Sequence, residues 1–358
     1  MKLVVLGLSL SSSWGNGHAT TYRALLKAFA ARGHDILFLE RETPWYAAHR
    51  DLGAPDFCRL ALYADLTALD RWRGEVTAAD MVMVGSYVPD GIAVGDWALR
   101  HARGVKAFYD IDTPVTLAAL DHGEGSYVST AQIPEYDLYL SFTGGPILDR
   151  LTGQYGAAMA RALYCSVDPD IYRPLNLPWR WDLSYLGTYS ADRQPMLERL
   201  LLEPARRAPD LRFAVAGPQY PDGIDWPANV ERFDHVPPSD HPEFYSASRF
   251  TLNITRQAMV AAGHSPSVRL FEAGACGTAI ISDRWKGLET LFRPGQIAIA
   301  EHAYDVLRVL GGGDRARTDL AEGARRQVLA AHTAAHRAAE LEALCRQPAL
   351  PDIVRLDA

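Results

Sequence analysis

Residues 251–283 read TLNITRQAMVAAGHSPSVRLFEAGACGTAIISD and contain the pattern that decides the fold. Apolar and β-branched residues from Phe250 to Ile254 predict a strand, and the run from Ala279 to Ser282 predicts a second one. Between them, Ser265-Pro266-Ser267 predicts the start of a short helix, which Gly277 ends. The sequence therefore predicts a strand, a loop, a helix and a strand in this order.

The start of this predicted helix has the composition of an anion site. Ser265 is a favourable N-cap, and Pro266 at the first helical position loses no hydrogen bond because its missing N–H would have no partner there. The amides of Ser267 and Val268 would then point into the loop. We expect them to form a cradle for phosphate.

Two arginines flank the cradle. Arg256 follows Thr255 in the loop, and Arg269 lies in the first helical turn, so both side chains can supply positive charge. Glu272 lies about one and a half turns into the helix. Its carboxylate can accept hydrogen bonds from two ribose hydroxyls, as acidic side chains do beside nucleotide pyrophosphates in other α/β folds.

The same stretch resembles the nucleotide-sugar site of GT-B glycosyltransferases. Phe271-Glu272-Ala273, followed by Ala275-Cys276-Gly277-Thr278, is similar to the family's "LEAMACGTPVI" ending. Among the branches, the chain most resembles the CgeB-like, spore-maturation type of the family 1 or family 4 enzymes. The resemblance implies that Glu272 is the second, ribose-binding Glu of the family's pattern, and that Ser265 to Val268 replace its glycine-rich phosphate turn. The first Glu, which helps to position the donor sugar, falls on His264, which is a departure from the family.

Length and composition indicate a globular enzyme with more than one domain. The chain has 358 residues, of which 48% are hydrophobic and 22% charged. A net charge of -7 argues against a nucleic-acid or anionic-membrane surface. The four cysteines have no metal-ligand spacing and are expected to be free buried thiols. The apolar run that begins at Leu3 is too short to span a membrane, so we expect a first core strand and no integral membrane segment. We also expect a cytoplasmic, bacterial protein.

Strand-length apolar runs alternate with helical patterns, which is typical of a parallel sheet covered on both faces. We predict strands over residues 3–8, 35–39, 81–85, 105–109 and 138–142, helices over 20–31 and 92–101, and a restart of the alternation at 183–186, 194–203 and 211–216. A proline-rich stretch without periodicity separates the two series. The expected architecture is an acceptor-side Rossmann-like domain at 1–166, a linker at 167–182, a nucleotide-sugar-binding Rossmann-like domain at 183–335, and a helix and tail at 336–358. By the resemblance these two domains face each other across a cleft, and the helical pattern over 314–347 crosses back to the first domain.

Two polar groups of the first domain follow predicted strands, where such sheets bind ligands. His18 starts a helix after a Ser and Gly-rich loop and resembles the family's "GH" loop, so it is a candidate general base; its alternative role is to cap the helix. Asp112 follows the strand that ends at Tyr109, and it would contact the acceptor or assist His18, or else form a turn before Thr113-Pro114. Metal binding by the Asp110-x-Asp112 pair is not expected.

The second domain contains further matches to the family. Arg193, after Gly187-Thr188-Tyr189, is similar to the basic residue that contacts the diphosphate, and it can equally be a solvated helix residue. His235 and Val236 fall where the family's backbone meets the base. We also assign Thr255, next to Arg256, to the donor site. The remaining histidines, including His241, are expected to be structural or exposed.

The resulting prediction is a metal-independent glycosyltransferase of the EC 2.4 class. It would need no cofactor, would use a nucleoside-diphosphate sugar as donor, and would act on an unknown acceptor, which can be a glycan, a small molecule or a protein. If His18 is the base, the reaction inverts the anomeric configuration. If the donor phosphate assists, the reaction retains the anomeric configuration. The alternatives are an enzyme similar to the nucleotide-sugar 2-epimerases and a catalytically idle module that binds a nucleotide sugar or another protein.

Overall fold

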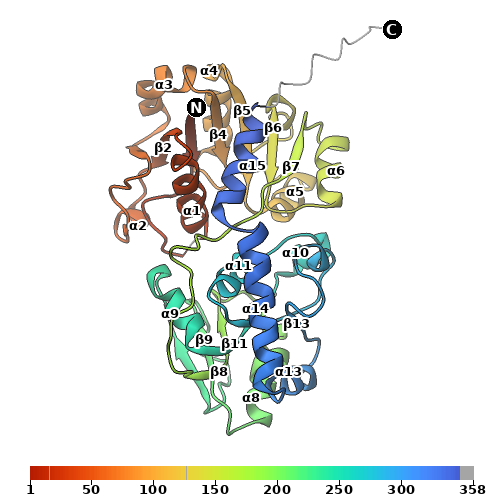
Figure 1. Cartoon of the computed structure of the whole chain (residues 1–358). Helices are drawn as coiled ribbons and strands as arrows, with labels where there is room; N and C mark the ends of the chain where they lie inside the picture. Colours follow the sequence, from red (N-terminus) through yellow and green to blue (C-terminus); the bar gives the residue numbers. More distant parts are fainter. Residues whose placement is uncertain (16, 126, 347–358) are drawn as a thin grey trace.

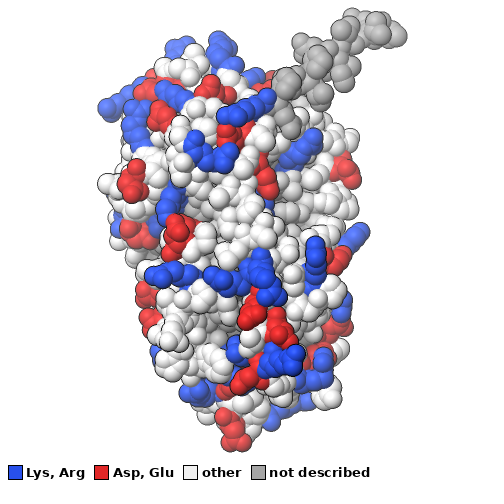
Figure 2. Space-filling model, viewed as in Figure 1, with Lys and Arg blue, Asp and Glu red and all other residues white. Residues whose placement is uncertain are grey.

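The computed structural model describes residues 1–15, 17–125 and 127–346. It shows two α/β domains, one above the other, with the C-terminal helices running along both (Figure 1). On the face viewed in Figure 2, basic and acidic side chains are interspersed over both domains. The predicted class, two Rossmann-like domains facing each other, is confirmed.

The first domain is built on a parallel sheet of seven strands. Its strands are almost continuously apolar because helices cover both faces of the sheet. All five strands predicted for this domain are present, with ends that differ by one or two residues. Their order across the sheet is β3 (Arg59–Tyr63), β2 (Asp35–Arg41), β1 (Lys2–Gly7), β4 (Met81–Gly85), β5 (Val105–Asp110), β6 (Leu138–Ser141) and β7 (Ala160–Ala162).

The helices of the first domain include both predicted ones. The remaining segments are short and follow the strands in chain order. The α-helices are α1 (His18–Ala30), α2 (Pro44–Ala47), α3 (Arg73–Thr77), α4 (Gly91–His101), α5 (Thr113–Asp121) and α6 (Pro146–Gly153), and two 3₁₀ segments cover Leu66–Trp72 and Ile133–Glu135.

The second domain repeats the pattern with a parallel sheet of six strands. The strand predicted from Phe250 to Ile254 is β11, and the strand predicted from Ala279 to Ser282 is β12. The order across the sheet is β10 (Val230–Phe233), β9 (Phe213–Ala216), β8 (Trp181–Leu186), β11 (Ser248–Asn253), β12 (Ala279–Ser282) and β13 (Ala298–Ile299).

The helix predicted over residues 194–203 forms as three consecutive helical segments, of which the middle one is a π-helix. A 3₁₀ turn at Pro238–Asp240 precedes α9. The helical segments of this domain are α7 (Gln194–Leu197), the π segment Glu198–Leu202, α8 (Glu203–Arg207), α9 (His241–Ser246), α10 (Gln257–Ala262), α11 (Val268–Ala275), α12 (Leu288–Leu291), α13 (Ala303–Leu310) and α14 (Asp314–Ala331).

The chain crosses between the domains twice, and the two crossings lie side by side. The first is the predicted linker: residues 168–180 form no helix or strand, and β8 begins at Trp181. The second is at His332 and Thr333. Val167 pairs with Thr333, its amide donates to the His332 carbonyl (3.2 Å), and its carbonyl accepts from the amide of Ala334 (2.8 Å).

This pairing divides the helical pattern predicted over residues 314–347 into two helices. The backbone of His332 and Thr333 bonds to Val167 instead of continuing a helix, so α14 ends at Ala331 and a separate helix, α15 (Ala334–Arg346), begins. As expected from the resemblance, α15 crosses back and packs against α1 of the first domain (Figure 1). The remainder of the predicted tail, residues 347–358, lies outside the described residues.

All four cysteines are free thiols, and Cys165 and Cys276 are buried, as expected. Cys58 and Cys345 are only partly buried. Within residues 1–15, 17–125 and 127–346, none of the helices has the length and apolar character needed to cross a membrane.

Candidate functional site

Two adjoining cavities lie between the domains, among loops that follow the carboxyl ends of the strands. The first, of about 270 Å³, contains Glu272 and is called the Glu272 cavity. The second, of about 290 Å³, contains Asp112 and is called the Asp112 cavity. Both cavities are lined by Gly17, Arg193, Ser267 and Val268. The amino end of α11 therefore lies at their junction.

The helix α11 begins at Val268, two residues later than predicted. Ser267 is its N-cap, and the Ser267 hydroxyl accepts a hydrogen bond from the amide of Arg269 (3.4 Å). The prediction that Ser265 is the cap is wrong, because its hydroxyl contacts Thr143 of the first domain (2.9 Å) instead. The first amides of any helix have no intrahelical partner, and those of α11 start beside both cavities. The predicted anion cradle therefore begins at Ser267.

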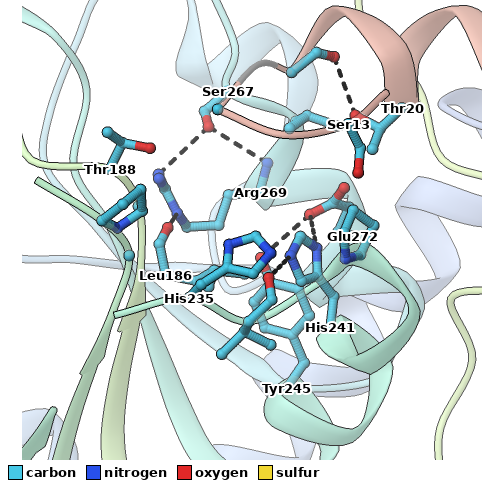
Figure 3. A pocket seen from close by; sticks show the side chains of 18 of the residues that line it. Ser13, Thr20, Leu186, Thr188, His235, His241, Tyr245, Ser267, Arg269 and Glu272 are labelled. Carbon is cyan, nitrogen blue, oxygen red and sulfur yellow. Dashed lines mark hydrogen bonds and ion pairs between the residues drawn. The ribbon is translucent and has the colours of Figure 1, made fainter. Parts of the chain in front are cut away.

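Arg269 is a buried cation in the Glu272 cavity (Figure 3). Its Nε donates to the carbonyl of Leu186 (2.6 Å), and its Nη1 donates to Oδ1 of Asn253 (3.0 Å). Within the described part of the chain, Arg269 forms no ion pair with a carboxylate at 4.0 Å or less. A buried charge without a counter-ion is costly. Arg269 is therefore suited to bind an anion in the cavity.

Glu272 is almost completely buried, with 4% of its surface exposed. Its Oε2 accepts a hydrogen bond from the Tyr245 hydroxyl (3.3 Å) and lies 3.7 Å from Nδ1 of His241. Burial acts to raise the pKa of Glu272, but contacts with His241 and other polar groups outweigh it, so the pKa is lowered. Glu272 is therefore ionised at neutral pH and can accept hydrogen bonds from hydroxyl groups.

His235 and Val236, which the sequence assigns to base contact, line the same cavity. Figure 3 shows His235 and His241 close together beside Glu272. Across the cavity, Gly217 has a φ of +144°, and a Cβ there would lie 2.1 Å from the Gly187 carbonyl oxygen. Gly187 and Gly217 both line the cavity. Their backbones approach each other so closely that a side chain at Gly217 has no space.

Arg193 lines both cavities, and its Nη2 donates to the carbonyl of Thr188 (2.6 Å). It is therefore held at the junction rather than extended into solvent. Thr255 lines the Asp112 cavity, where its amide and hydroxyl both donate to Asp283 (2.9 Å each). This pair of bonds holds the loop that carries Arg256.

His18 is the first residue of α1 and lines the Asp112 cavity. Gly17 is the N-cap of α1, so His18 does not cap the helix. The imidazole is buried, packs edge-on against the Tyr87 ring with centroids 5.3 Å apart, and its Nδ1 has no partner within the described residues. Burial lowers the pKa of His18 to about 4. The ring is therefore neutral at pH 7 and able to accept a proton.

Asp112 lies on the same cavity, but it does not hydrogen-bond to His18. Its Oδ2 accepts from the Tyr87 hydroxyl (3.1 Å) and lies 3.5 Å from Nη1 of Arg256, which belongs to the second domain. Burial raises the pKa of Asp112, and Arg256 opposes this shift. Asp112 is also the residue that precedes α5, so the turn predicted as its alternative role is present as well.

Asp110 points into the core of the first domain instead. Its carboxylate accepts from Tyr139 (2.6 Å) and Thr116 (2.9 Å), and burial raises its pKa to about 6. Among residues 1–15, 17–125 and 127–346, no three His, Cys, Asp or Glu side chains are grouped as a metal site would require.

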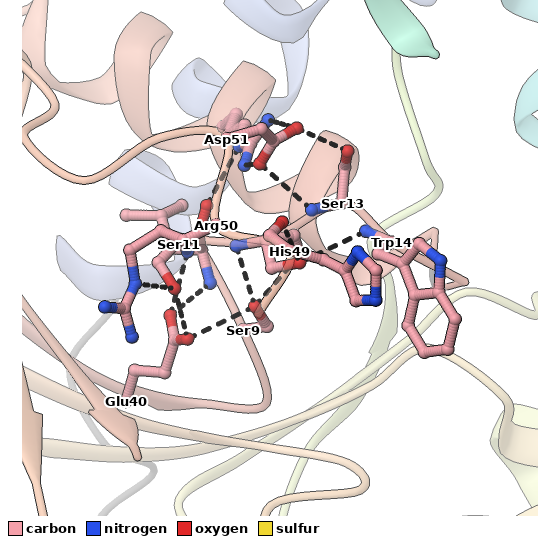
Figure 4. Close-up of polar contacts among 11 residues, drawn as sticks. Ser9, Ser11, Ser13, Trp14, Glu40, His49, Arg50 and Asp51 are labelled. Atoms are coloured by element: carbon pink, nitrogen blue, oxygen red, sulfur yellow. Dashed lines mark hydrogen bonds and ion pairs between the residues drawn. The ribbon is translucent and has the colours of Figure 1, made fainter. Parts of the chain in front are cut away.

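One wall of the Glu272 cavity is formed by Ser13, in the loop between β1 and α1, and Thr20, in the first turn of α1. The buried carboxylate of Glu40 accepts hydrogen bonds from the amides of Leu10 (2.7 Å) and Ser11 (2.9 Å), as Figure 4 shows for this cluster. Asp51 accepts from the Ser13 amide (3.1 Å). These bonds tie the loop to β2 and to the segment after α2.

Comparisons with solved structures identify the fold. Sucrose-phosphate synthase from Thermosynechococcus elongatus is 15% identical, with a TM-score of 0.67 over 97% of this chain and 99% of that one. Anabaena HepE in complex with UDP and glucose is 11% identical, with a TM-score of 0.69 over 96% and 99% of the chains. An alpha-glucosyltransferase, AGT, in complex with UDP is 12% identical, with a TM-score of 0.70 over 97% and 100%. This chain has the GT-B fold.

Residues 193–343 of the GT-B chain also match the family model described as glycosyl transferase-like. The match covers most of the second domain and includes α11. No curated protein matches the chain by sequence.

His264 occupies the place of the first Glu of the GT-B pattern, but it lines neither cavity. Its backbone has a φ of +47°, and its ring lies against two glycines, where a Cβ at Gly145 or Gly287 would come within 2.4 Å of the imidazole. Its carbonyl accepts from the amide of Gly144 in the first domain (2.9 Å). In this GT-B structure, His264 is therefore a contact between the domains.

The prediction that His241 is structural or exposed missed a lining residue of the Glu272 cavity. Tyr245, four residues later on α9, was also missed, although a spacing of four places two side chains on one face of a helix. Tyr172, from the linker, contacts His241 (3.3 Å). The spacing of four between His241 and Tyr245 in a short helix was the sequence signal that could have identified both residues.

Proposed function

We propose that this protein transfers a sugar from a nucleoside-diphosphate sugar to an acceptor hydroxyl. The observation that carries the proposal is the Glu272 cavity, in which a buried cation, a helix amino terminus and an ionised carboxylate lie together between two domains. A diphosphate fits the first two groups, and ribose hydroxyls fit the third. Two GT-B neighbours, HepE and the alpha-glucosyltransferase, are in complex with UDP in their structures, which supports a uridine nucleotide as the first donor to test.

The donor side would act on the leaving group. When the bond between the anomeric carbon and the diphosphate oxygen breaks, negative charge develops on that oxygen. Arg269 and the amides at the start of α11 are positioned to stabilise this charge in the Glu272 cavity. Arg193 and Arg256, which both line the adjoining cavity, would add further positive charge.

The acceptor side would be the Asp112 cavity. In the inverting course, the neutral His18 accepts the proton of the acceptor hydroxyl, whose oxygen then forms the bond to the anomeric carbon. Asp112 is the carboxylate among the residues lining this cavity and would bind a sugar or acceptor hydroxyl once Arg256 turns to the diphosphate. His264 would support the donor sugar only indirectly, by holding the two domains together.

We also propose that the transfer needs no metal, that the protein is of the CgeB-like subtype and that it is located in the cytoplasm. Charge neutralisation by arginines and a helix terminus supplies what a divalent cation supplies in other transferases. Free thiols, which all four cysteines are, persist in a reducing compartment.

A direct test is incubation with a panel of nucleoside-diphosphate sugars with and without candidate acceptors. Sugar transfer that depends on an acceptor supports the proposal. Epimerised donor without an acceptor supports the epimerase alternative. Nucleotide binding without any turnover supports the idle module, which the departure at His264 makes worth testing.

A further inference from the structure

His241 touches two parts of the Glu272 cavity at the same time. Its Nε2 lies 3.2 Å from the carbonyl oxygen of Val236, in the segment assigned to the base. Its Nδ1 lies 3.7 Å from Oε2 of Glu272, the carboxylate assigned to the ribose. The imidazole therefore spans the distance between the two subsites, as Figure 3 shows.

The contact with Val236 determines which ring nitrogen carries the proton. A carbonyl oxygen can only accept a hydrogen bond, so the Nε2 of His241 must donate. The Tyr172 hydroxyl, 3.3 Å from Nδ1, and the carboxylate of Glu272 face the opposite side of the ring. The two ring nitrogens of His241 therefore face different groups.

The surroundings keep the ring in this place. The carboxylate of Glu272 is buried, and the Tyr245 hydroxyl on the same helix as His241 also donates to Oε2 (3.3 Å). The rings of His241 and Tyr245 meet edge-on, with centroids 6.3 Å apart. A shift of the imidazole would therefore move the carboxylate and the Val236 backbone together.

We propose that His241 is a positioning residue that couples the ribose and base subsites, so that the cavity recognises a ribonucleoside as one unit. This inference rests on the proposed nucleotide-binding function and adds a residue that sets specificity for the nucleoside. Through Nε2 the residue donates to the Val236 carbonyl, and the Nδ1 side of its ring packs beside the Glu272 carboxylate and limits where that carboxylate can lie.

Two substitutions separate the two tasks. The amide nitrogen of Gln reaches the position of Nε2, so His241→Gln keeps a donor for Val236 and removes the group beside Glu272. The amide nitrogen of Asn reaches the position of Nδ1, so His241→Asn keeps a polar group beside Glu272 and removes the donor for Val236. His122→Gln, on an exposed residue at the end of α5, is the matched control.

The measurements are dissociation constants from calorimetry. UDP, CDP, GDP and ADP give the discrimination between bases, and the 2′-deoxy form of the tightest ligand gives the preference for ribose. In the wild type, removal of the 2′-hydroxyl should weaken binding by roughly tenfold or more, the effect of losing one hydrogen bond to a charged group. We expect His241→Gln to lose most of the ribose preference but to keep the base discrimination, and His241→Asn to do the reverse.

A purely structural role would change all affinities by one factor and leave both ratios unaltered in both variants, which would overturn the inference. Unaltered affinities in both variants would overturn it as well. If the wild type binds none of the four nucleoside diphosphates, the proposed function fails and the inference fails with it. If the wild type binds one of them and both ratios survive in both variants, the inference alone fails. Thermal unfolding of each variant verifies that it folds.

Discussion

Arg256 of the second domain and Asp112 of the first meet across the cleft, with Nη1 of the arginine 3.5 Å from Oδ2 of the carboxylate. Both side chains line the cavity in which sugar transfer is proposed. Because a diphosphate competes for the same guanidinium, donor binding would release Asp112 toward a sugar hydroxyl. The ion pair is partly solvated, so it contributes little to stability by itself.

The ribose assignment predicts the behaviour of Glu272→Ala. The variant should bind nucleoside diphosphates more weakly by about 1.5 to 3 kcal/mol, because hydrogen bonds to a charged group are lost. Calorimetric titration measures this difference, and Glu322→Ala, on an exposed pair with Arg326, is the control. Equal affinity in Glu272→Ala and wild type would disprove the assignment.

The phosphate assignment predicts the behaviour of Arg269→Lys. Lysine keeps the charge but cannot reproduce the fork that bonds to Leu186 and Asn253, so affinity for a nucleoside diphosphate should fall about tenfold or more while affinity for the nucleoside falls less. Titrations with the two ligands give the comparison. Arg284→Lys, outside both cavities, should change neither constant. An equal loss for nucleoside and nucleoside diphosphate would point to a structural role instead.

Metal independence is a prediction of its own. Nucleotide binding and activity should persist in excess chelator, because arginines and the α11 terminus would supply the charge stabilisation. The assay is the transfer rate before and after chelation. Loss of activity with recovery on adding magnesium or manganese would refute this prediction and would make the Asp112 region a candidate metal site.

The base assignment predicts that His18→Ala lowers kcat by roughly 10²- to 10⁴-fold with little change in donor affinity. Because burial lowers the pKa of His18 to about 4, the wild-type enzyme should lose activity only as the pH falls toward 4, and this acidic limb should be absent in the variant. Pre-steady-state rates from pH 3.5 to 8 give the profile. A variant with near-native kcat and the same acidic limb would transfer the role to Asp112 or to a donor-assisted, retaining course.

His332 gives a prediction about stability. Its ring stacks on Phe271 with centroids 4.6 Å apart, and burial, aided by Arg337, lowers its pKa to about 4. The unfolded chain takes up this proton near pH 6.5 and the folded chain does not, so folding is favoured most above pH 6.5 and loses this contribution as the pH falls toward 4.

Between pH 7.5 and 4.5, His332 should therefore lower the free energy of unfolding by roughly 2 to 3 kcal/mol. Urea denaturation at both pH values, in wild type and in His332→Phe, tests this. The variant should lose less stability over that interval. If both proteins lose the same amount, the buried imidazole is not the cause.

The sequence was sufficient for the class of fold because the central strands, such as β1 and β4, are nearly continuous apolar runs that alternate with helical patterns. The strands β3, β7, β10 and β13 are shorter or less buried and were not predicted. It was also sufficient to place Glu272 and Arg269, since both lie on one short helix whose start is encoded by adjacent residues. Residues that are close together in the sequence therefore determine both the strands and helices and the placement of Glu272 and Arg269.

The errors concern contacts between segments far apart in the sequence. Ser265 is a good N-cap by residue type, but Thr143 of the other domain binds its hydroxyl. The sequence predicted the C-terminal helices but not the place where α14 ends, which lies beside the pairing of Val167 with Thr333. No local pattern contains these two contacts. His241 contacts Val236 and Glu272, which lie on other elements, so its spacing from Tyr245 on α9 was the available local signal.

The pairing of α15 with α1 has a consequence for synthesis on the ribosome. Domains generally fold as units in the order in which they emerge. The first domain cannot follow this rule, because α1 packs against α15, and Arg32, just after α1, forms an ion pair with Glu342 of α15, although the whole second domain separates these segments in the chain. Until α15 emerges, one side of α1 stays uncovered, so a nascent chain holds an incomplete first domain throughout translation of the second.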